Sequence, residues 1–197
     1  MLTATYTLVA LSVEQTNMRV SLHAVQQLVQ KSYARQTALT SGQADYVCDT
    51  LRSLYEQSHR RKLDRFLLPA LRRATNGAAA LVAELDQLSR DAVEALGSAR
   101  RLAQGGIDNE ERVEAFCTAV ERFCAALMQR FEREELELFP VARAAIAGET
   151  WFAMAHQMLA YDAWRQEHRG KLDAPPASRP ARPEHAHRQG PPVSYMH

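Results

Sequence analysis

The chain has 197 residues, with 24 Lys and Arg, 23 Asp and Glu, and three Cys. This length predicts a single domain that can bury a sizeable core. A net charge of +1 gives no electrostatic basis for binding nucleic acid, which requires clustered Lys and Arg. Three Cys without a CxxC pair favour reduced thiols that pack as small apolar residues.

The apolar run at residues 7–13 does not fit a targeting or membrane segment. No Lys or Arg precedes it, as a secretory signal would require. It is also far shorter than the roughly 20 residues of a membrane span. We therefore expect a cytoplasmic protein with neither a membrane nor nucleic acid as a partner.

Apolar residues recur at helical spacing as far as about residue 170, and no alternating run is long enough for a strand. The stripe from Met18 to Val29 predicts a first helix over about residues 8–36. Thr40-Ser41-Gly42 can cap a second helix, which we expect to run to about Ala74.

Three further helices are expected in the second half of the chain. The third carries an apolar stripe from Leu81 to Leu102 and ends at Gly105-Gly106. Asp108 can cap the fourth, whose apolar face extends from Phe116 to Leu138. A shorter fifth helix is expected over about residues 149–168.

The fold we expect is all-α: an up-down-up-down four-helix bundle with a short fifth helix, together spanning residues 1–170. The fifth helix is apolar on more than one face, so it either caps the open end of the bundle, which we favour, or forms a dimer interface. Residues 171–197 hold six of the eight Pro, which predicts a disordered tail. His185, His187 and His197 of this tail could bind a metal loosely, but we expect them to be solvated.

Two near-copies of one phrase, 71 positions apart, end at Pro69 and Pro140. Pro inside a helical pattern usually kinks or ends the helix. Residues four apart lie on one helical face, so the phrases place His59 beside Leu63 and Arg130 beside Glu134. We infer two helices related by an internal pseudo-symmetry, with the side-chain spacing that metal sites use.

These phrases resemble the hemerythrin family in its bacterial form, the HHE cation-binding domain, over about residues 8–160. Members carry His-x-x-x-Glu, followed six residues later by Pro, on the second and fourth helices. The resemblance implies that His59 and Glu134 are retained metal ligands, and it assigns probable lost ligand positions on all four helices. These lost positions are Gln15, Leu63, Ser89 and Arg130.

Glu134 falls at the same helical angle as Phe116 and is therefore expected in the core. A buried carboxylate must be protonated, paired with a cation or bound to a metal. We favour an ion-pair network with Arg130 or His59, the alternatives being metal ligation or a wrong helical register. For His59 we favour a hydrogen-bonded core side chain over a ligand, and we expect His23 at the surface and His156 in packing.

The resemblance implies a di-iron centre with His and carboxylate ligands from all four helices, of which the chain supplies two. Arg130 would also put a fixed positive charge where a dication would sit. We therefore expect no cofactor and a non-catalytic regulatory or interaction protein, with an unknown protein partner or self-association.

The main alternative is a non-haem iron protein with an irregular site, which would bind oxygen or nitric oxide, or sense or store iron. Its ligands would be His59, Glu134 and residues such as Tyr55, Glu56 or Glu135. Haem bound between helices, with His59 or a Cys as axial ligand, is a third option. No nucleophile and base pair, Gly-rich phosphate loop or Cys/His cluster supports a conventional enzyme.

Overall fold

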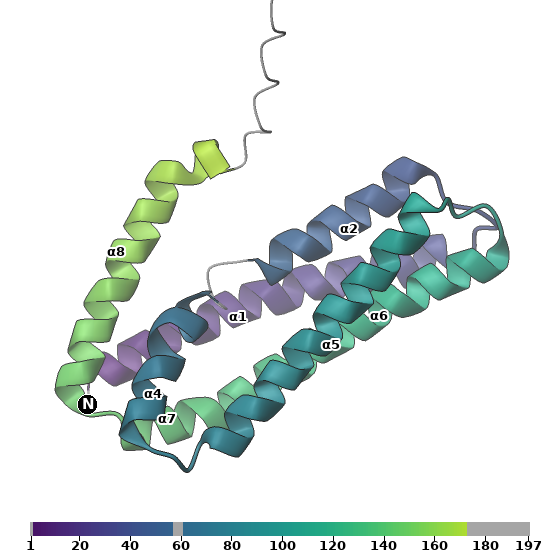
Figure 1. Cartoon of the computed structure of the whole chain (residues 1–197). Helices are drawn as coiled ribbons and strands as arrows, with labels where there is room; N and C mark the ends of the chain where they lie inside the picture. Colours follow the sequence, from purple (N-terminus) through teal and green to yellow (C-terminus); the bar gives the residue numbers. More distant parts are fainter. Residues whose placement is uncertain (1, 57–60, 173–197) are drawn as a thin grey trace, which may run out of the picture.

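The computed structural model describes residues 2–56 and 61–172, with side chains described as far as residue 168. Figure 1 shows the long helices α1, α2, α5 and α6 running side by side as a bundle, with α8 leaving one end at an angle. The described residues form no strand, and Leu39 and Ile107 make an isolated β-bridge. The expected all-α bundle is confirmed.

The structure consists of α-helices and of π-helical turns, which are labelled η. In chain order they are α1 (Leu2–Leu28), η1 (Val29–Tyr33), α2 (Ser41–Tyr55), η2 (Leu63–Leu67), α4 (Leu68–Ala74), α5 (Ala79–Gln104), α6 (Glu110–Arg133), η3 (Glu134–Leu138), α7 (Phe139–Ala145) and α8 (Gly148–Leu172).

The first half of the bundle differs from the expectation in two places. The first helix begins six residues earlier than expected, at Leu2. The second helix is capped as expected, because the Thr40 hydroxyl accepts from the Gln43 N–H while the Gln43 side chain accepts from the Thr40 N–H. However, α2 ends at Tyr55 rather than continuing to Ala74. A turn follows at Glu56, and the chain is helical again from residue 61 to Ala74, where the second helix was expected to end.

The third helix, α5, ends at Gly105 and Gly106, as predicted. Gly106 has a φ of 78°, in the left-handed region that favours Gly, and it follows the last turn of α5. The fourth helix is capped by Asn109, whose side chain accepts from the Arg112 N–H. The expectation of Asp108 as the cap was wrong by one residue, because Asn109 is the one with extended backbone immediately before the helix.

The two Pro-terminated phrases fold alike. η2 and η3 begin at Leu63 and Glu134, 71 positions apart, and Pro is the second residue of the helix that follows each. In each copy the first residue of that helix donates its N–H to a carbonyl five residues back. A Pro ring collides with the carbonyl four residues earlier in an α-helix, and a widened π turn makes room for it. The inferred pseudo-symmetry is confirmed in the backbone.

The core is divided into two apolar clusters along the bundle axis. One fills the end formed by α2 and the C-terminal part of α5, with Leu22, Leu51 and Phe123 at its centre. The other fills the end formed by α4, α7 and the start of α1, with Leu71, Leu85 and Trp151 among its members. α1 and α5 contribute to both clusters, and the chain passes from the first cluster to the second where α6 continues into η3. The buried polar residues lie at this level.

α8 covers the second cluster. It packs on α1 and η2, and it buries Trp151, Met154 and Met158. The expectation that this helix caps one end of the bundle is confirmed for its first half. It is longer than expected and reaches Leu172, past the tail boundary placed at residue 170. The rest of the predicted tail, including its three His residues, lies outside the described residues.

The cysteines are buried and unpaired with one another. Cys48, Cys117 and Cys124 all belong to the first apolar cluster and form no disulfide. Burial raises the pKa of Cys48 and of Cys117 to about 11, and that of Cys124 to about 12. The expectation that these residues pack as small apolar side chains is confirmed. Within the described ranges, no helix combines the length and the apolar character that crossing a membrane requires.

Candidate functional site

A layer of buried polar side chains separates the two apolar clusters. It contains one residue from each of four elements, α1, α5, α6 and η3, and each is at most 4% exposed. These residues are Gln15, Ser89, Arg130 and Glu134. We call them the polar layer.

Arg130 and Glu134 form the centre of the polar layer. They are one turn apart, at the junction of α6 and η3, and Arg130 Nε lies 2.7 Å from Glu134 Oε1. Both side chains are almost completely removed from solvent. The predicted ion pair is confirmed, and it is a buried pair rather than a surface pair.

The second oxygen of Glu134 is also engaged. Gln15, which reaches across from α1, donates from Nε2 to Glu134 Oε2 over 2.7 Å. A buried carboxylate is tolerated when its oxygens accept hydrogen bonds from donors that also supply positive charge. Here the Arg130 guanidinium supplies a charged donor from α6, and the Gln15 amide supplies a neutral donor from α1.

Arg130 links this pair to the third long helix. Its Nη1 donates to the Leu85 carbonyl over 3.1 Å and to the Ser89 hydroxyl. Ser89 Oγ in turn donates to the same carbonyl over 3.2 Å. The guanidinium therefore binds α5 through a main-chain acceptor that no sequence pattern identifies.

The remaining nitrogen of Arg130 faces η2. Arg130 Nη2 lies 3.8 Å from Asp64 Oδ1, and it has no hydrogen-bond partner among the described residues. Asp64 is about two-fifths exposed, so this contact joins a buried side chain to one at the surface. The guanidinium thus touches α5, η3 and η2, which are three of the elements that meet at this level.

Four of the site positions predicted from the sequence lie together in the polar layer. Gln15, Ser89, Arg130 and Glu134 are joined by hydrogen bonds into one network. Leu63 is fully buried at the start of η2, one residue before Asp64, and belongs to the second apolar cluster. His59 lies outside the described residues. His23 is exposed, as expected, and hydrogen-bonds Gln27. His156 is exposed too, and its ring lies edge-on to that of the exposed Phe152 with 4.6 Å between centroids, so its packing is a surface contact within α8.

Sequence reasoning missed a second buried cation. Lys62 is 4% exposed and its Nζ binds Glu14 of α1 and Asp162 of α8, the latter over 2.6 Å. Burial opposes the charge, but hydrogen bonds and attraction from the two carboxylates outweigh it and raise the pKa of Lys62. Lys62 therefore ties α8 to the bundle beside the polar layer.

The groups in the polar layer do not fit a di-iron centre. A guanidinium has no lone pair to offer a metal and keeps its positive charge at any physiological pH. The other family positions hold an amide, a hydroxyl and an aliphatic side chain. Among the described residues, no three His, Cys, Asp or Glu side chains gather as a metal-binding group.

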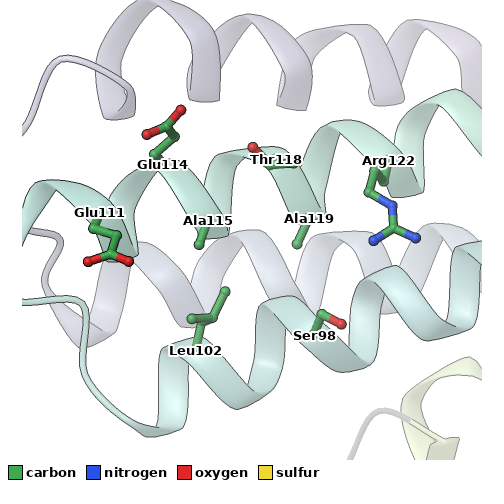
Figure 2. A pocket seen from close by; sticks show the side chains of 8 residues that line it. All are labelled: Ser98, Leu102, Glu111, Glu114, Ala115, Thr118, Ala119 and Arg122. Atoms are coloured by element: carbon green, nitrogen blue, oxygen red, sulfur yellow. The ribbon is translucent and has the colours of Figure 1, made fainter.

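The surface also has a shallow depression. It has a volume of about 470 Å³ and lies between α5 and α6, away from the polar layer. Figure 2 shows Glu111 and Arg122 at opposite ends of the row of Ala115 and Ala119, with Glu114 pointing to the other side of the helix. Binding sites place a few polar groups so that they converge on one ligand, and these do not.

Comparison with known proteins agrees with the geometry of the bundle. The family model of the hemerythrin HHE cation-binding domain matches residues 11–142, from the middle of α1 to α7. No curated protein and no solved structure matches the chain. The matched range contains both Pro-terminated phrases and every residue of the polar layer. The chain belongs to the hemerythrin HHE cation-binding domain family.

Proposed function

We propose that this hemerythrin-like bundle is a non-catalytic protein with a regulatory or interaction role, in which an internal ion-pair network occupies the level of the family's metal site. The observation that carries the proposal is the Arg130 guanidinium. It sits in the core, in contact with Glu134, Ser89 and the Leu85 carbonyl.

Charge supports this proposal. In relatives, a cation-binding domain balances its buried carboxylates with metal ions. Here Arg130 supplies the balancing positive charge for Glu134 within one helical turn. A metal ion added beside the guanidinium would meet a like charge in a region where water cannot screen it.

The state of the thiols supports the non-catalytic part of the proposal. A cysteine nucleophile needs a lowered pKa and an exposed, electropositive setting. All three Cys are buried, and burial raises their pKa values to about 11 or 12. They are suited to packing rather than to covalent chemistry.

Iron content tests the proposal. The protein would be expressed in iron-rich medium, purified without chelator and subjected to elemental analysis and absorption spectroscopy. We expect far less than the roughly two irons per chain of a di-iron centre, and no charge-transfer colour. A value close to two would overturn the proposal and favour the iron-binding alternative.

A matched variant makes this test more informative. Gln15→His, Leu63→Glu, Ser89→His and Arg130→His together return to the chain the ligand types that the family uses at these positions. We expect this variant to hold more iron than the wild type under the same conditions. Circular dichroism of both proteins would establish that the bundle is retained in the comparison.

A further inference from the structure

α1 presents a second apolar stripe on the side opposite the core. The stripe has helical spacings of four, three, four, three and four residues. Its apolar members are between 54% and 71% exposed. In order, the stripe residues are Leu2, Tyr6, Val9, Val13, Thr16 and Val20. An exposed apolar stripe of this length requires an explanation, since scattered single residues do not form one.

This face of α1 carries no formal charge. Among Asp, Glu, Lys and Arg, α1 contains only Glu14 and Arg19. Both point toward other elements of the bundle, where Glu14 binds Lys62 and Arg19 binds Glu135 over 3.1 Å. In a chain in which 24% of residues are charged, this surface has nothing to repel an identical surface.

We propose that the exposed stripe of α1 is a contact surface for a second copy of this chain, with the two α1 helices antiparallel across a two-fold axis. Alternating spacings of three and four residues are those of a seam between two packed helices. A two-fold axis requires one patch to be complementary to itself. The proposal rests on the outer face of α1 alone and holds whether or not the bundle binds iron.

The antiparallel arrangement follows from the order of residue sizes along the stripe. With the axis beside residue 11, Leu2 faces Val20, Tyr6 faces Thr16 and Val9 faces Val13. Each layer then combines a large residue with a small one, or two of equal size, as close packing requires. A parallel pair would place Tyr6 on Tyr6 and Thr16 on Thr16, and would align the two helix dipoles unfavourably.

Sedimentation of the full chain tests the surface. We expect the wild type, of 22.1 kDa per chain, to shift from monomer to dimer over roughly a hundredfold range of concentration. Val9→Glu should give monomers throughout that range. The control is Val93→Glu on α5, which replaces another half-exposed Val outside the stripe. It should dimerise like the wild type.

Disulfide trapping tests the register. Single Val9→Cys and Val13→Cys variants should give no cross-link under mild oxidation, whereas the double variant should give a covalent dimer, because each new thiol faces the other position in the second copy. The wild type, with three buried thiols, is the control. A wild type that stays monomeric, a Val9→Glu variant that still dimerises, or efficient cross-linking of either single variant would overturn the proposal.

Discussion

Arg130 and Glu134 form a buried ion pair that links several elements of the bundle. The guanidinium contacts two neighbouring elements besides its partner, and Gln15 adds a contact from α1. Burying two charges costs several kcal/mol per ion before their attraction is counted. Hydrogen bonds to both Glu134 oxygens and to the Leu85 carbonyl offset part of that cost.

Lys62→Met tests the second buried cation. We expect a loss of roughly 1–2 kcal/mol of unfolding free energy near neutral pH, since Glu14 and Asp162 are about a third exposed and solvent screens part of the attraction. The wild-type pKa is raised above its ordinary value of 10.5, so the folded state binds this proton more tightly than the unfolded state. Its contribution is therefore complete below pH 10.5 and is lost as the pH rises through the folded-state pKa.

The measurement is urea unfolding of both proteins from neutral to strongly alkaline pH. The stability difference between wild type and variant should shrink above about pH 10.5, because only the wild type loses a stabilising proton. A difference that is constant across this range would show that the Lys62 ammonium does not stabilise the fold.

Residues differ in how far the sequence could predict their role. Glu134 was placed in the core because its helical angle matches that of Phe116, and both are fully buried. The burial of Lys62 could not be predicted, because its partner Asp162 comes 100 positions later on a helix whose packing no local pattern reveals. The Leu85 carbonyl was beyond prediction, since main-chain acceptors leave no sequence signal.

At the scale of elements, the π turns are the feature that the two Pro residues produce. η2 and η3 place Leu63 and Glu134 at equivalent points, as the first residue of each π turn. π turns are frequent at functional sites in helical proteins. The same π turn begins with the aliphatic Leu63 in one copy and with the ion-paired carboxylate of Glu134 in the other.

The start of α6 offers a clean test of an element boundary. Asn109→Ala should lower the unfolding free energy by about 1 kcal/mol, because the Asn109 side chain accepts from the Arg112 N–H over 2.9 Å. Asp108→Ala should cost less than half as much, since Asn109 fills the cap position. Urea denaturation measures both variants, and equal losses would mean that the two residues share the cap.

Element positions were predictable where apolar stripes and caps coincide. Thr40, Gly106 and the third helix satisfied both conditions, and their boundaries agree with the structure. The second helix was expected to be continuous, but α2 ends at Tyr55 and the chain is helical again from residue 61 to Ala74. A periodic pattern on both sides of a gap does not show that the helix crosses it.

For the whole molecule, the polar layer divides one bundle into two apolar halves, and α8 closes one of them. The family match ends at residue 142, before α8 begins. Lys62 and Trp151 nevertheless join α8 to the matched part, through an ion pair and through the second cluster. The folding unit thus extends beyond the matched range to include at least the first half of α8.

The Pro-rich end of the chain provides a test at this scale. Deleting residues 173–197 should leave the thermal midpoint nearly unchanged, because this segment has few apolar side chains to add to a core. Calorimetry of the full and shortened chains measures the difference. A drop of many degrees in the shortened chain would mean that the segment packs on the bundle.

The measurement that tests the central claim most directly is a double-mutant cycle on Arg130 and Glu134. Arg130→Met and Glu134→Leu should each cost about 3–5 kcal/mol of unfolding free energy, because each strands a buried charge. The double variant should recover most of that loss. The partly exposed pair Arg133 and Glu137 has the same spacing, with Arg133 Nε 3.0 Å from Glu137 Oε1, and is the control. It should show a coupling of about 0.3–0.5 kcal/mol. Mild, additive losses at Arg130 and Glu134, or a Glu134→Leu variant whose main defect is lost iron, would contradict the account.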